Sequence, residues 1–200
     1  MPGVDVSELP TGVQFVTSPV QKTFDGQIFP LILAPDDQHK DHDCAWWQQW
    51  VKDNLEGLRT LIFKYGAILF RDFPLAEPVD FDLFAKAFGY VEFPYLGGVS
   101  VRRPVVGNCY TATESPPECI IQFHHEMAHV EDYPKVLFFY CQVWAAAFTS
   151  YIYMKRTLPI SPTLPYKSCI INRNRTKFDA NRLYRINRSK SSLMKLSVNS

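Results

Sequence analysis

The chain of 200 residues has few cysteines, and they share no Cys-x-x-Cys spacing: the five lie at positions 44, 109, 119, 141 and 169. It also lacks a secretory signal, because Met1–Glu8 is acidic and has no apolar segment. These absences argue against a secreted, disulfide-framed protein. We therefore expect reduced thiols and a cytoplasmic location.

Acidic residues are almost missing from the last fifty positions. Residues 1–150 hold 10 Lys/Arg and 19 Asp/Glu, whereas residues 151–200 hold 11 Lys/Arg and a single acid, Asp179. The formal charge of +1 hides this asymmetry. Residues 144–200 are interpreted as a divergent basic tail, either disordered or an alternative or misassigned exon. A tail that contacts nucleic acid or anionic lipid, and a folded element, are the less favoured alternatives.

Long apolar runs are also scarce. Residues 136–154 form a stretch of 19 positions without a charge, which is long enough to span a bilayer. The stretch nevertheless contains Gln142, Thr149, Ser150 and several tyrosines. Its first half also has the pattern of a core strand, so a transmembrane helix is not favoured.

What is present indicates one domain. The chain is 46% hydrophobic and 14% aromatic, which suffices for a sizeable core. We predict two short strands within residues 13–34, around a turn at Asp25–Gly26. A helix is expected over 43–65, with Asp43 as N-cap and Gly66 as its stop.

Further along, the pattern predicts a strand at 66–70 and a second helix that opens at Pro78 and ends at Gly89. The apolar face of this helix comprises Phe81, Phe84, Ala85 and Phe88. Residues 135–143 form a β-branched and aromatic run typical of a buried strand.

Two metal motifs overlap in Phe123–His129. On a strand, residues i and i+2 share a face, so His124 and Glu126 could hold one metal ion. On a helix, residues i and i+4 share a face, so His125 and His129 could hold zinc with Glu126 as general base. Whether the segment is strand or helix therefore largely decides the function.

The neighbouring residues favour the strand. Residues 119–123 are rich in β-branched and aromatic side chains, and Pro116, Pro117 and Pro134 leave little room for a long helix. The helical interpretation, a His-Glu-x-x-His zinc protease, also lacks a third ligand, since no Glu follows Glu131. Two other His-x-acid pairs, His39 with Asp41 and His129 with Glu131, are interpreted as a solvated loop and a surface or outer pair.

Several motifs occur in the order found in one known family. They are Gly66–Pro74, Phe81–Gly89, Pro94–Gly98, Thr111–Pro117 and Phe123–Ala128. From about residue 22 to residue 143 the chain resembles the taurine dioxygenase and clavaminate synthase-like superfamily, in particular its plant clavaminate synthase-like branch.

The resemblance implies an oxidoreductase that uses Fe(II) and 2-oxoglutarate to act on a small molecule. It implies His124 as the first iron-binding histidine and Glu126 as the carboxylate of a 2-His-1-carboxylate triad, with no catalytic residue beyond these metal ligands. It also implies a fold of the α+β class, mostly β. That fold is a double-stranded β-helix, or jelly roll, with flanking helices, of which residues 1–143 would form the incomplete N-terminal part.

The resemblance stops at Val143. The Gly-Gly-Glu-Thr-like turn of the family is replaced by Trp144–Ser150, and no histidine follows His129. The distal histidine and the 2-oxoglutarate-binding arginine are therefore not found. We expect a truncated dioxygenase that is inactive alone, poorly soluble or partly molten, because Lys135–Val143 would be without its full set of strand neighbours. The alternative is a non-catalytic isoform that binds a partner. The sequence sets neither the substrate nor the oligomeric state.

Overall fold

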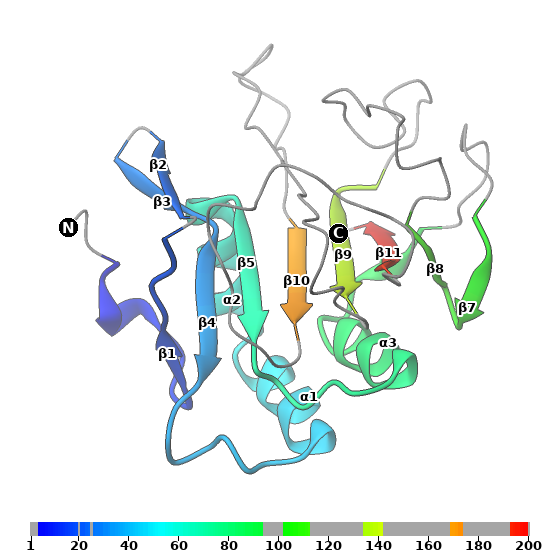
Figure 1. Ribbon diagram of the computed structural model, residues 1–200, viewed down its shortest axis with the longest axis horizontal. Coiled ribbons are helices and arrows are strands. Elements are labelled where there is room, and N and C mark those ends of the chain that lie inside the picture. The colour runs from blue at the N-terminus through cyan, green and yellow to red at the C-terminus, as the bar shows by residue number, and fades with distance from the viewer. Residues whose placement is uncertain are drawn as a thin grey trace.

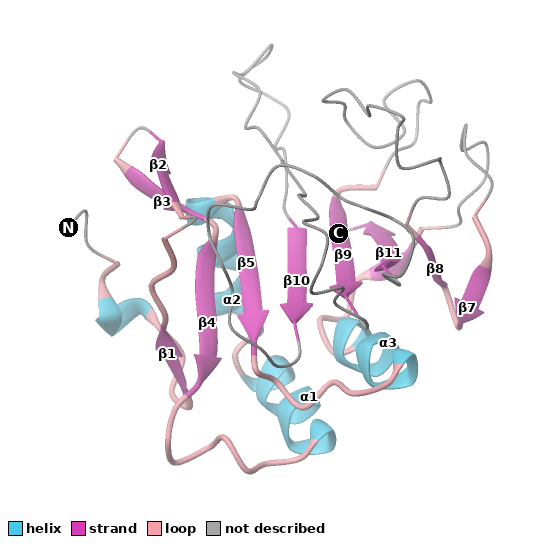
Figure 2. Cartoon of the chain, viewed as in Figure 1, coloured by secondary structure: helices cyan, strands magenta, loops and turns pink. Residues whose placement is uncertain are grey.

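The computed structural model describes residues 4–19, 21–24, 26–93, 102–112 and 134–141 (Figure 2). It also describes the backbone of 169–173 and 193–199. The elements before the first long helix are a 3-10 turn, η1 (Val6–Glu8), and the strands β1 (Val13–Phe15), β2 (Lys22–Phe24), β3 (Gln27–Phe29) and β4 (Leu31–Pro35). The β2–β3 hairpin confirms the turn expected around residue 26, and Gly26 has the positive φ of +79° that such a turn favours.

Nine of the described strands form one mixed sheet, in the order β1-β4-β5-β10-β9-β11-β8-β7, with β6 paired to β11, whereas β2 and β3 form a separate hairpin (Figure 1). Its remaining members are β5 (Ala67–Arg71), β6 (Val91–Glu92), β7 (Pro104–Val106), β8 (Cys109–Thr111), β9 (Val136–Cys141), β10 (Cys169–Arg173) and β11 (Leu193–Asn199). Strands β4, β5, β10 and β9 run parallel to one another, whereas β1 pairs antiparallel with β4 and β11 pairs antiparallel with β9.

Among the described residues, three helices accompany the sheet: α1 (Cys44–Asp53), α2 (Leu55–Tyr65) and α3 (Pro78–Lys86). Helix α2 packs on β5 and on the β2–β3 hairpin, and α3 packs against β7, β9 and β11. Helix α1 contacts both other helices (Figure 1). The part of the chain that the structure describes is therefore a mixed α/β fold. Two facing jelly-roll sheets are not among the described strands, so that finer expectation stays a prediction.

The helix expected over 43–65 is two helices, which corrects the prediction. Asp43 does cap α1, since its carboxylate accepts the N–H of Trp46 at 2.8 Å, and Gly66 ends α2 with φ +77°. The helix is interrupted at Asn54, whose side-chain amide and backbone N–H both donate to the carbonyl of Trp50. Asparagine competes for backbone groups in this way and is a weak helix former.

Two segments of the C-terminal region, β10 and β11, lie within the sheet, where the sequence pattern indicates no regular element. The side chains of both segments are of kinds that favour strands. Residues 169–171 are Cys-Ile-Ile, and 194–199 alternate apolar and polar side chains. Strand β9 is paired on one side with β10 and on the other with β11. The expectation that β9 lacks strand neighbours is therefore wrong.

Aromatic rings make up most of the largest side chains in the core. The largest fully buried side chains include Trp47 of α1, Phe70 of β5, Phe73 and Phe138. The Trp47 and Phe73 ring centroids lie 4.5 Å apart with planes at 64°, the edge-to-face arrangement that aromatic pairs prefer. Trp47 is therefore a packing residue of the core.

No helix among the described residues is long and apolar enough to cross a membrane. Residues 136–141, the start of the uncharged stretch 136–154, form strand β9. The remainder of that stretch lies outside the described residues.

Candidate metal centre

The predicted iron ligands lie between two strands whose places in the sheet are defined. Strand β8 ends at Thr111 and β9 begins at Val136, so the intervening chain carries the whole motif. Both strands pair antiparallel with β11, which lies between them, and Met194 faces Thr111 on one side and Tyr140 on the other. Strands β8 and β9 therefore run parallel to each other.

The motif residues themselves, His124, His125, Glu126 and His129, lie outside the described residues, as does Glu131. Neither the strand interpretation nor the helical zinc interpretation is tested by the structure. The geometry that can be examined is the support of the two flanking strands.

Strand β9 is fixed by the hydroxyl of Tyr140. Its oxygen lies 2.9 Å from the carbonyl oxygen of Leu75 and 3.0 Å from that of Ala76, so its proton is shared between two acceptors in the segment before α3. The Tyr140 ring stacks on Phe81 of α3, with centroids 5.2 Å apart and planes at 15°. Burial raises the pKa of Tyr140 to about 12, so the phenol stays neutral and remains a donor.

Strand β8 is fixed by a buried carboxylate, Asp82 of α3, whose side chain is 6% exposed. Its Oδ1 accepts from the Cys109 thiol at 3.6 Å, and its Oδ2 accepts from Lys86 Nζ at 2.7 Å. A buried carboxylate needs such partners, because an unpaired charge in the interior is costly. Burial, followed by the charge of Asp82, raises the pKa of Cys109 strongly and keeps it a thiol.

The turn between β7 and β8 is held by the same group of charges. The amide of Asn108 donates to Glu92 of β6, and Lys86 Nζ lies 3.6 Å from the other Glu92 oxygen. Lys86 thus bridges Asp82 and Glu92, and its hydrogen bond to Asp82 raises its pKa. Gly107 has φ +52° and lies so close to Asp82 that a Cβ would be 2.7 Å from Oδ1. Only glycine fits this approach without a shift.

The open end of the hairpin is closed by backbone and side-chain hydrogen bonds. The N–H of Thr111 donates to the carbonyl of Arg103 at 3.0 Å, and the N–H of Arg103 donates to the Thr111 hydroxyl at 3.0 Å. Arg102 Nη1 also donates to the Thr111 carbonyl at 3.2 Å. The hairpin is therefore tied at its turn and at its base.

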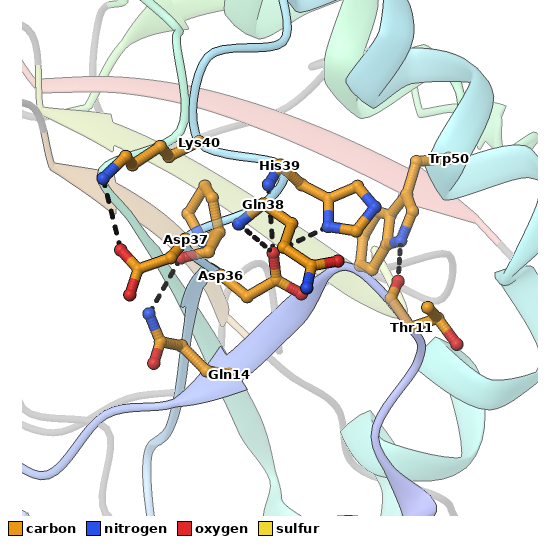
Figure 3. A network of polar contacts seen from close by, with 9 residues as sticks. Thr11, Gln14, Asp36, Asp37, Gln38, His39, Lys40 and Trp50 are labelled. Atoms are coloured by element: carbon orange, nitrogen blue, oxygen red, sulfur yellow. Dashed lines mark hydrogen bonds and ion pairs between the residues drawn. The ribbon is translucent and has the colours of Figure 1, made fainter.

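A second histidine group, at residues 36–43, lies within the described residues, and Figure 3 shows its part from Asp36 to Lys40. His39 was interpreted together with Asp41, but its Nδ1 lies 2.6 Å from Asp36 Oδ1. That contact lowers the pKa of Asp36. The His42 ring stacks on Trp46 with centroids 4.0 Å apart. No group of three His, Cys, Asp or Glu side chains in the described part of the chain could hold a metal ion.

The contacts of Asp82 and Tyr140 were missed from the sequence. Asp82 lies next to Phe81 on a helix whose apolar face the pattern predicts, so an acid flanking that face is a weak signal of burial. Tyr140 is one aromatic among several in β9, and nothing local indicates that its hydroxyl reaches residues 64 and 65 positions earlier. Both contacts depend on long-range packing.

Comparison with known proteins agrees with the order of the motifs. The model of the taurine catabolism dioxygenase TauD, TfdA family matches residues 28–147. A clavaminate synthase-like protein from Arabidopsis thaliana is 40% identical over 128 residues, which is 62% of this chain and 39% of that protein. The chain belongs to the TauD/TfdA dioxygenase family, as the resemblance over residues 22–143 predicts. It spans about two fifths of the length of the curated relative it matches.

Proposed function

We propose that the chain is the N-terminal part of an Fe(II)- and 2-oxoglutarate-dependent dioxygenase, with His124 and Glu126 as two of its iron ligands. One observation carries the proposal: the family match covers residues 28–147, which include the motif and both flanking strands. The incomplete jelly roll expected from the resemblance belongs to the same proposal.

The donor set fits the metal. A neutral imidazole and a carboxylate are ligands that suit Fe(II) in the 2-His-1-carboxylate arrangement. When bound, the iron and 2-oxoglutarate would together supply oxidising power toward a C–H bond of a small molecule. The work of this chain would be to hold the metal through His124 and Glu126. A reducing compartment such as the cytoplasm would favour the Fe(II) state.

The chain supplies no histidine after His129, so the third protein ligand has no counterpart in its residues 130–200. A second function is therefore kept: a non-catalytic form that binds a partner. The observation that favours it is that Trp144–Ser150 replace the Gly-Gly-Glu-Thr-like turn of the family. The helical zinc site of His125 and His129 is the third and weakest alternative.

The test is the affinity for Mn(II), as a stand-in for Fe(II), in the presence of 2-oxoglutarate. The whole chain is compared with His124→Ala, His129→Ala and His39→Ala. The last variant is a matched control, because His39 belongs to the separate group near Asp36. Metal binding followed by electron paramagnetic resonance should be lost in His124→Ala alone.

Other outcomes separate the alternatives. Loss only in His129→Ala would replace the iron site by the helical zinc site. No binding by any of the chains would favour the non-catalytic form. Loss only in His39→Ala would assign the metal to residues 36–43 and contradict the proposal.

A further inference from the structure

Helix α3 contacts both strands that flank the predicted metal motif. On one side Phe81 stacks on Tyr140 of β9, while the Tyr140 hydroxyl reaches the carbonyls of Leu75 and Ala76 just before the helix. On the other side Asp82 accepts from Cys109 of β8. We call this set, the 75–76 carbonyls with Phe81, Asp82 and Lys86, the α3 platform.

We propose that the α3 platform positions the metal centre, with Asp82 and Tyr140 as positioning residues that hold β8 and β9 against α3 and the segment before it. This inference rests on the proposed function. It adds that residues which do not touch the metal control its affinity, by fixing both ends of the segment that carries His124 and Glu126.

The burial of charge supports a positioning role. Asp82 is the one charged residue among the buried side chains of the described part of the chain. A buried ion pair is weak support for stability, because desolvation offsets the attraction, but it fixes a geometry when both partners are satisfied. Here the carboxylate joins α3, the β7–β8 turn and, through Lys86, Glu92 of β6. The Asp82–Lys86 pair therefore joins three elements.

The close approach of Gly107 supports the same conclusion. A Cβ at this position would lie 2.7 and 2.9 Å from the two Asp82 oxygens. The β7–β8 turn can therefore approach the Asp82 carboxylate this closely only when residue 107 is glycine. By contrast Gly89, which also has a positive φ of +68°, has no atom within 4 Å of its built Cβ.

The experiment measures Mn(II) affinity with 2-oxoglutarate in the whole chain and in Asp82→Asn and Tyr140→Phe, which preserve side-chain size. Val51→Ala is the control, because Val51 is fully buried in α1 and its apolar side chain takes part in none of the polar contacts of the α3 platform. Thermal midpoints are recorded for all four. We expect Asp82→Asn and Tyr140→Phe, called the platform variants, to lose about two- to thirtyfold in metal affinity, the range typical of residues that act through others. The control should keep the affinity at a comparable loss of stability.

The outcomes separate the inference from the function on which it rests. If the unmodified chain binds metal and the platform variants bind equally well, the α3 platform is only structural and the inference is wrong. An equal loss in Val51→Ala would mean that affinity simply follows global stability, which also overturns it. If the unmodified chain binds no metal, the proposed function fails first, and the inference with it.

A second comparison still tests the inference if Asp82→Asn folds poorly. Gly107→Ala is expected to lower metal affinity, whereas Gly89→Ala is expected to leave it unchanged, although both place alanine at a positive φ. In an Asp82→Ala background the additional effect of Gly107→Ala should shrink, since the oxygens that crowd the new methyl are gone. Equal effects of the two glycine variants would contradict the positioning role.

Discussion

The two ends of the sheet are held together by different forces. Beside β4 and β5, helices α1 and α2 bury Trp47, Trp50 and Leu58 against apolar neighbours. Beside β8 and β9, α3 adds a buried carboxylate and a buried phenol that are both hydrogen-bonded. Apolar packing is non-directional and tolerates adjustment, whereas buried polar contacts specify one geometry.

This difference matches the positions of the predicted functional residues. The end at β8 and β9, which is held by polar contacts, flanks the segment with His124 and Glu126. The end at β4 and β5, which we call the aromatic end, does not. A metal site needs its ligands within a fraction of an ångström, which depends on the residues behind them. Precision is therefore the role that we propose for the α3 platform, whereas apolar burial at the aromatic end contributes stability without specifying one geometry.

The largest effect should come from the aromatic end. Trp47→Ala is expected to cost about 3–5 kcal/mol of unfolding free energy, because a fully buried indole leaves a cavity. Chemical denaturation of the whole chain measures it. Trp46→Ala is the matched control, since Trp46 is only partly buried and stacks on His42. An equal loss in both variants would contradict the location of the core.

Tyr140→Phe should have a smaller effect on stability. Loss of the Tyr140 hydroxyl leaves the carbonyls of Leu75 and Ala76 without their donor. This is expected to cost about 1–3 kcal/mol of unfolding free energy. Because burial raises the pKa of Tyr140 to about 12, its contribution is complete below the ordinary phenol pKa and is lost as pH rises toward and through 12. The stability gap between Tyr140→Phe and the unmodified chain should therefore narrow in strong alkali, and a constant gap would show that the hydroxyl is not buried.

Removal of either of two helix caps should cost a similar free energy of unfolding, but only one of the two should couple to Tyr140. Asp43→Ala removes the cap of α1, and Asp80→Ala removes the acceptor for the N–H groups of Ala76 and Glu77 before α3. Each should cost about 1 kcal/mol. Only Asp80→Ala should be non-additive with Tyr140→Phe, by roughly 0.5 kcal/mol or more, because both act on Ala76. Additive behaviour of both pairs would separate Tyr140 from the α3 platform.

The sequence predicts the aromatic end better than the polar end. The cap at Asp43, the stop at Gly66 and the strand at 66–70 follow from local patterns, since caps and periodicity are decided within a few residues. The break at Asn54 was missed because the apolar period continues across it. Strands β10 and β11, and the contacts of Asp82 and Tyr140, depend on pairs more than 25 residues apart. The motif at 123–129 was found by pattern and supported by the family match, while its local structure stays a prediction.

The smallest effect belongs to the Asp36–His39 pair, which lies on the aromatic side and is partly exposed. The hydrogen bond from His39 lowers the pKa of Asp36. A lowered folded pKa means that the contribution to stability is present above the unfolded value and is lost as pH falls through the folded one. The unmodified chain should therefore exceed Asp36→Asn in thermal midpoint near neutral pH, and the difference should close in acid.

The matched control for this pair is Asp37→Asn. Asp37 pairs with Lys40 at 3.2 Å but its side chain is 92% exposed, and exposed ion pairs contribute little. The pH dependence should therefore be smaller for Asp37→Asn than for Asp36→Asn. Because neither residue lies near the α3 platform, both variants should keep the metal affinity of the unmodified chain. A loss of affinity in Asp36→Asn would break the comparison, since it would show that the aromatic end also controls the metal centre.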